Sequence, residues 1–140
     1  MILKAATVIL AFVALGVGGM VYVMFRHDIL AFKWVERYTD IRMPHFRNFN
    51  SYNLSDWVIY SLPDGLWLFA YILLMATIWD FNIKKGSVLI IGFPLLSVIS
   101  EFLQFLKVLP GTFDRIDVLA YIFAFILGLI YIQIISKQNL

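Results

Sequence analysis

The sequence predicts an all-α integral membrane protein, a bundle of four transmembrane helices in a single domain spanning residues 1–140. Hydrophobic residues make up 62% of the chain and charged residues only 14%, whereas soluble domains are about half apolar and about a quarter charged. Four apolar stretches approach the roughly 20 residues that a helix needs to cross the hydrocarbon core. They are residues 5–25, 63–79, 87–106 and 118–135. The last three are joined by short links, which favour antiparallel neighbours.

The first apolar stretch, 5–25, predicts a retained transmembrane helix. Its apolar run exceeds the roughly 7–15 residues of a cleavable signal core, and no convincing cleavage site precedes its charged end. Gly16, Gly18 and Gly19 form a patch of small residues where another helix could approach closely. The alternative is that these glycines are simply tolerated in a helix that faces lipid.

The segment between the first two spans, residues 26–62, predicts an aromatic loop that lies on the membrane surface. Ile29, Phe32, Val35 and Tyr38 recur at roughly helical spacing among charged residues, which favours a short interfacial helix. The alternative is an irregular loop with aromatic anchors at headgroup depth. The polar run 53–56 predicts the start of a separate short helix before the second span.

Proline positions set the expected boundaries of the next spans. Pro63 fits the first turn of the second span, with Asp64 beside it at the positive end of the helix. Pro94 lies inside the third span and predicts a kink, because proline removes a hydrogen bond from the helix interior.

Polar residues gather where spans two, three and four meet one membrane surface. Counting crossings puts the start of the second span, the end of the third and the start of the fourth on the same side. On the third span, Ser97, Ser100, Glu101 and Gln104 are spaced i, i+3, i+4 and i+7, which predicts a polar stripe facing the fourth span. A carboxylate turned toward lipid would be costly, so the stripes should face each other. We therefore expect a one-sided acidic pocket, and its candidate residues are Asp64, Glu101, Gln104, Asp114, Arg115, Asp117 and Tyr121.

Simpler interpretations of these residues remain open at this stage. Asp64 and Asp114 could cap helices, and Arg115 could be a surface cation. Glu101 could instead hold a divalent cation with the other oxygen ligands, or act as a general acid or base. In a purely architectural reading, Arg115 pairs with one or two of the acids and pins the hairpin.

Composition excludes several other kinds of function. The chain has no cysteine and two histidines, so thiol chemistry is excluded and a histidine-based zinc or haem site is not expected. A net charge of +2 is too small for a nucleic-acid binder. Anionic lipid headgroups are the natural partners of basic residues that flank apolar spans.

The acidic hairpin resembles the VanZ-like family of small polytopic membrane proteins. The resemblance rests on Glu101 and Gln104, a Pro-Gly turn, then Asp114 and Asp117 at the head of the last span. It is clearest over residues 97–128. Two positions depart from the family pattern: Thr112 stands where an arginine is common and Tyr121 where an asparagine is common. The resemblance implies a cell-envelope context, with founding members associated with glycopeptide (teicoplanin) resistance.

The sequence thus leads to an expectation with two rivals. The expectation is a multi-pass protein of a prokaryotic inner (cytoplasmic) membrane that contacts a lipid-linked or glycopeptide-like ligand. One rival is a metal-assisted lipid-phosphate transferase or hydrolase. The other is a small accessory subunit that binds other membrane protein subunits through its glycine patch and aromatic loop.

Overall fold

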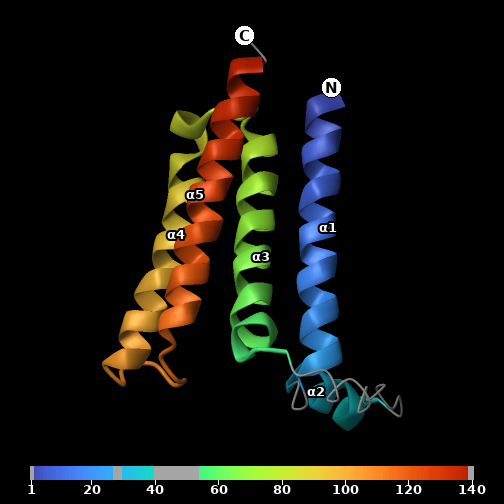
Figure 1. Cartoon of the computed structure of the whole chain (residues 1–140), viewed down its shortest axis with the longest axis vertical. Helices are drawn as coiled ribbons and strands as arrows, with labels where there is room; N and C mark the ends of the chain where they lie inside the picture. Colours follow the sequence, from blue (N-terminus) through green and yellow to red (C-terminus); the bar gives the residue numbers. More distant parts are fainter. Residues whose placement is uncertain (1, 27–29, 40–53, 139–140) are drawn as a thin grey trace.

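The computed structural model describes residues 2–26, 30–39 and 54–138, and these residues form five α-helices. Four are long and apolar enough to cross a membrane. The fifth, α2, is short and lies beyond the end of α1, at the lower end of Figure 1. The bounds are Ile2–Phe25 for α1, Leu30–Tyr38 for α2, Asp56–Ile78 for α3, Ile83–Phe105 for α4 and Arg115–Gln138 for α5. The predicted all-α membrane bundle is confirmed.

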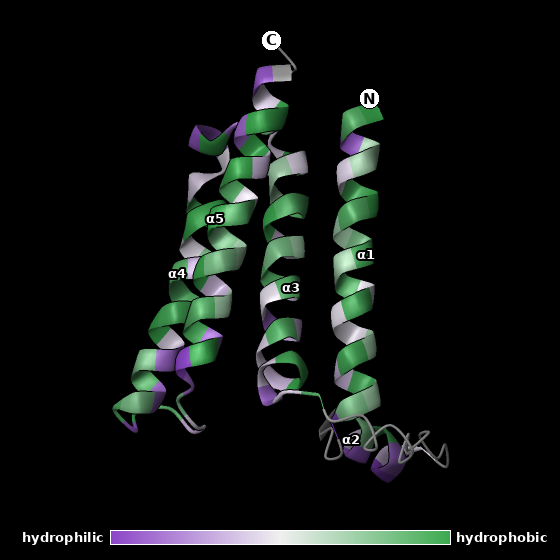
Figure 2. Cartoon of the chain, viewed as in Figure 1, coloured by the Kyte–Doolittle hydropathy of each residue, from purple (hydrophilic) through white to green (hydrophobic). Residues whose placement is uncertain are grey.

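The short helix predicted after the first span is confirmed as α2, and its location at the membrane interface stays a prediction. Apolar and charged residues segregate to opposite faces of this helix, which lies beyond the end of α1 in Figure 2. Trp34 and Tyr38 are exposed on it, as expected for aromatic side chains at a membrane–water interface. Both histidines, His27 and His45, lie outside the described residues, as does the part of the predicted aromatic loop from 40 to 53.

Helix α3 differs from the prediction at its start. It begins at Asp56 instead of Pro63, so the separate short helix expected from the run 53–56 is the first part of α3 itself. Ser55 has extended backbone at the N-cap position and Asp56 places a carboxylate in the first turn, where the helix dipole favours it. Pro63 and Asp64 therefore lie two turns inside the helix, and the expected capping role of Asp64 is wrong.

Helix α3 is the centre of the bundle. It packs on α1 on one side and on α5 on the other, and α4 packs less extensively on both α5 and α3. Ala11 and Ala14 of α1 are buried with Ala70 and Leu73 of α3. Small residues allow this close approach of two apolar helices, because no large side chain separates their backbones.

Glycines mark the closest helix contacts. A Cβ on Gly18 would lie 2.7 Å from the Trp67 indole nitrogen, and one on Gly65 would lie 3.3 Å from Ala120. A Cβ built at Gly16 or Gly19 would meet no atom of another described element within 4 Å. Of the three glycines in the predicted patch, Gly18 therefore packs against α3, whereas Gly16 and Gly19 do not pack against another described helix.

The tight turn between α3 and α4 closes the end of the bundle that also carries both termini (Figure 1). Asp80 and Phe81 have positive φ angles of 53° and 58°, a conformation that costs free energy for residues with a side chain. Phe81 is only 1% exposed, so its burial helps to hold the turn. Lys4 of α1 forms an ion pair with Asp80 at the same end.

Candidate acidic site

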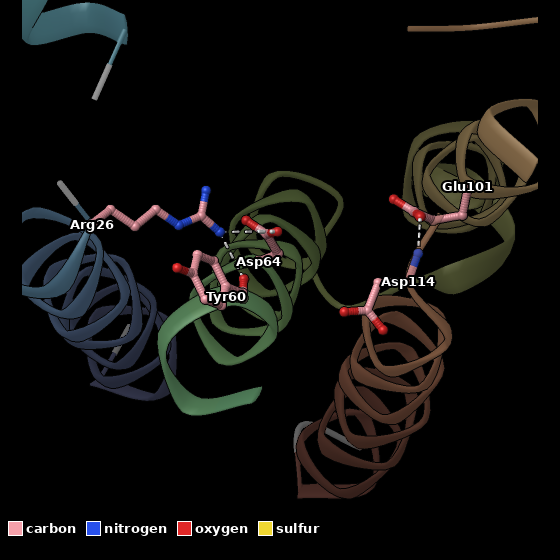
Figure 3. A network of polar contacts seen from close by, with 5 residues as sticks. All are labelled: Arg26, Tyr60, Asp64, Glu101 and Asp114. Atoms are coloured by element: carbon pink, nitrogen blue, oxygen red, sulfur yellow. Dashed lines mark hydrogen bonds and ion pairs between the residues drawn. The ribbon is translucent and has the colours of Figure 1, made fainter. Parts of the chain in front are cut away.

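Arg26, at the end of α1, reaches across to α3. Its Nη2 donates a hydrogen bond of 2.8 Å to the Tyr60 carbonyl and lies 4.0 Å from Oδ2 of Asp64, as Figure 3 shows. Its guanidinium also lies 4.4 Å from the Tyr22 ring centroid, within the range of a cation–π interaction. Arg26 thus joins the end of α1 to α3 through a backbone carbonyl and a carboxylate one turn apart.

Glu101 is the most buried acid of the cluster. It is 5% exposed within α4, and its Oε2 accepts a hydrogen bond of 3.4 Å from the backbone N–H of Asp114. That distance is long for a bond between an amide and a carboxylate, which is normally about 2.7–3.2 Å. No cation forms an ion pair with Glu101 among the described residues. A buried carboxylate is therefore left with little compensation.

Asp114 caps α5, as one of the sequence interpretations proposed. Its Oδ1 accepts a hydrogen bond of 2.8 Å from the N–H of Ile116, which is the standard N-cap bond to the second helical residue. Its own N–H is the donor to Glu101. Asp114 thus joins the end of α4 to the start of α5.

The turn between α4 and α5 depends on Gln104 and Gly111. Gly111 has a φ of 139°, and a Cβ there would lie 2.6 Å from the side-chain oxygen of Gln104. Gln104 therefore packs against the turn itself. It belongs to the acidic end of the bundle as predicted, but it contacts the turn that holds Asp114 in place.

Asp117 and Tyr121 complete the cluster from α5. Charge–charge interactions connect Asp117 with both Asp64 and Glu101, and Tyr121 is within range of the same three acids. The Oδ1 of Asp117 is buried and accepts no hydrogen bond from the described residues. Four carboxylates from α3, α4, α5 and the turn before α5 thus share one end of the bundle, and the predicted gathering of acids is present.

Three other predicted residues do not take part as expected. Arg115 is exposed and forms no ion pair with the described residues, so the architectural hypothesis in which it closes the acid cluster is wrong. Ser97 and Ser100 donate to the carbonyls of Phe93 and Ser97 on their own helix. The serines of the predicted polar stripe on α4 therefore form their hydrogen bonds within α4. Near the end of the helix, Glu101 instead accepts a hydrogen bond from Asp114, just before α5.

The sequence did not predict the role of Arg26, the cation that pairs with an acid of the cluster among the described residues. A signal was present, because Arg26 directly follows the first span and the crossing count already placed it on the acidic side. Its role could not be read from spacing, since the contact joins residues 26 and 64 on separate helices.

The arrangement favours binding hydrogen-bond donors more than binding a metal ion. No three His, Asp or Glu side chains among the described residues converge closely enough to hold one. The divalent cation considered as one alternative therefore finds no group of three such ligands among the described residues. The groups that the site can offer to a ligand are carboxylate oxygens, which accept hydrogen bonds and attract cations.

An apolar groove of about 460 Å³ lies between α3 and α5, and it is separate from the acids. Ile116, Ala120, Phe123 and Leu127 line it and recur at i, i+4, i+7 and i+11 along α5. Asp114, Asp117 and Tyr121, at i, i+3 and i+7, belong to a different face of that helix. The groove is the apolar, outward surface of the helix pair, and the acids lie on the side toward α4.

Comparisons with family models, with curated proteins and with solved structures find no match to this chain.

Proposed function

We propose that this chain is a VanZ-like cell-envelope protein of a prokaryotic inner membrane that binds a lipid-linked or glycopeptide-like ligand at its acidic end. The resemblance around Glu101, Gln104, Asp114 and Asp117 supports the family and its link to antibiotic resistance. The four membrane-length helices support the multi-pass location.

The observation that carries the proposal is the uncompensated burial of Glu101. An isolated buried carboxylate is costly, and it normally persists because a partner or a function maintains it. Within the described residues the partner is one long hydrogen bond from Asp114. A ligand that donates hydrogen bonds to Glu101 would complete the shell that the protein leaves incomplete.

The nearby free oxygen of Asp117 points to the same ligand chemistry. Its Oδ1 is buried and no described residue donates a hydrogen bond to it, and Asp64 and Glu101 add like charge around it. A group rich in ammonium, amide N–H or hydroxyl donors relieves this repulsion, whereas a bare phosphate would increase it. The sugar and peptide portions of a lipid-linked or glycopeptide-like molecule carry such donors.

The proposal is tested by binding of two probes to the protein in nanodiscs: teicoplanin, and a lipid-linked disaccharide-peptide. We expect Glu101→Gln and Asp117→Asn each to weaken binding of at least one probe by about tenfold, the order expected for losing a charge-assisted hydrogen bond of about 1.5–3 kcal/mol. Asp56→Asn is the matched control, because Asp56 is an exposed acid at the same end of the bundle.

Equal binding by the wild type, Glu101→Gln and Asp117→Asn would contradict the proposal. So would an equally large loss in Asp56→Asn, because binding would then depend only on the general negative charge of this end.

A further inference from the structure

The opposite end of the bundle contains a second polar site, which the acidic site does not explain. A hollow of about 530 Å³ lies between the α3–α4 turn and the last turns of α5. Asn82 and Lys84 line it from one side, and Gln133, Ser136 and Lys137 line it from the other. Ile132 is fully buried beneath them, so the hollow has an apolar floor and a polar rim.

The charge of this hollow is positive. Lys84 and Lys137 come from different helices, both are exposed, and neither forms an ion pair with a described residue. The acid at the rim, Asp80, is already paired with Lys4. The two lysines are therefore available to a ligand.

The start of α4 adds hydrogen-bond donors to the same place. Asn82 accepts from the N–H of Lys85, while the N–H groups of Ile83 and Lys84 are in the first turn, where a helix offers no acceptor of its own. The positive end of the helix dipole favours an anion at this position. Two cationic side chains and a helix start thus converge on a hollow beside apolar helices.

We infer that this hollow binds the phosphate of an anionic phospholipid. Its position at the end of membrane-spanning helices is the depth at which lipid phosphates lie, and basic pockets between transmembrane helices suit such headgroups. Ile132 and Phe81 are buried together beneath the charges, and this packing holds the turn against α5. The inference is independent of the acidic site.

The experiment measures retention of phosphatidylglycerol and phosphatidylcholine on the full chain by native mass spectrometry and lipid titration. We expect tighter binding of phosphatidylglycerol, and a loss of roughly fivefold for each of Lys84→Gln and Lys137→Gln, the size expected for one lysine near a lipid surface. Lys84→Arg should retain binding, because it keeps the charge and the donors.

Lys85→Gln is the matched control, since Lys85 is an exposed lysine in the same turn that does not line the hollow. The inference is overturned if Lys85→Gln weakens binding as much as Lys84→Gln, because the attraction would then belong to the surface as a whole. It is also overturned if the two lipids bind equally, or if inorganic phosphate at millimolar concentration displaces phosphatidylglycerol. All four variants change exposed side chains, so thermal unfolding should match that of the wild type.

Discussion

The two ends of this bundle differ in how they treat charge. At the acidic end, carboxylates from several helices are partly or fully buried, and one arginine, Arg26, lies among them. At the turn end, the charged side chains of Lys4, Asp80 and Lys84 are exposed. The first arrangement is costly unless something completes it, whereas the second is inexpensive because water solvates each charge.

This difference separates charges that are buried inside the bundle from charges that stand in water at its other end. Glu101 is only 5% exposed, and among the described residues it accepts a single long hydrogen bond. Lys84 and Lys137 stand at the rim of an open hollow and need no partner to be stable. Substitutions should therefore change stability strongly at the acidic end and weakly at the turn end, and the predictions below test that contrast from the largest effect to the smallest.

The largest effect is expected for Gly18→Leu, which disrupts the seat of α1 on α3 near the acidic end. A side chain at this position meets the Trp67 ring and the Pro63 carbonyl, and overpacking of this kind costs about 1–3 kcal/mol. Displacing α1 should also move Arg26 from Asp64. Denaturant unfolding in mixed micelles measures the loss.

Gly19→Leu is the control for that substitution, because nothing lies within 4 Å of a Cβ at Gly19. It changes the helix propensity of α1 by the same amount. Equal unfolding free energies for the two variants would show that α1 does not pack on α3 through Gly18.

The next effect is expected for Arg26→Leu. The variant loses the hydrogen bond to Tyr60 and the ion pair with Asp64, and it leaves Asp64 among other acids. We expect a loss of about 2 kcal/mol, since hydrogen bonds from charged groups contribute about 1.5–3 kcal/mol and this pair is partly screened by solvent.

Arg115→Leu provides the comparison for Arg26→Leu, at the same end of the molecule. Arg115 is exposed and without an ion pair to the described residues, so its removal should change the unfolding free energy by less than about 0.5 kcal/mol. If Arg115→Leu destabilised the protein as much as Arg26→Leu, the assignment of the cluster's cation would be wrong.

These two arginines show how far sequence reasoning could reach. The four spans, the interfacial helix and the gathering of acids at one end follow from hydropathy, loop length and crossing counts. The orientation of Arg115 depends on the rotation of α5. Because each helical residue turns by about 100°, facing Asp117 and Tyr121 inward places Arg115 outward. The spacing of residues in the hairpin therefore predicts the outward orientation of Arg115 only after the inward-facing residues of α5 have been identified.

The start of α3 and the role of Arg26 could not be predicted for a different reason. Proline is common in the first turn of a helix, so Pro63 looked like a boundary. In the structure α3 continues through it from Asp56, and packing on α1 and α5 outweighs the missing hydrogen bond. Arg26 and Asp64 are separated by a long polar segment, and no local pattern links them.

A third prediction reverses the usual sign of a core substitution. Glu101→Gln removes a buried charge that has no ion-pair partner in the described residues while keeping the shape of the side chain, so it should raise the unfolding free energy by about 1 kcal/mol. Together with weaker ligand binding, this would show that stability is given up at the acidic end for function. A destabilised Glu101→Gln would mean that the charge is compensated within the protein.

The smallest effect is expected at the turn end, from the ion pair between Lys4 and Asp80, both of which are exposed. The hydrogen bond and charge of Lys4 hold the pKa of Asp80 below its usual value of 3.8. A carboxyl whose pKa is lower in the folded state stabilises the protein above its unfolded pKa, and this contribution disappears as the pH falls through the folded pKa. The difference in melting temperature between the wild type and Asp80→Asn should therefore be small at pH 6 and vanish well below pH 3.8. A difference that persisted unchanged in strong acid would mean that Asp80 acts through its left-handed backbone conformation (φ 53°) and not through its charge. The contrast between the two ends would then rest on the acidic end alone.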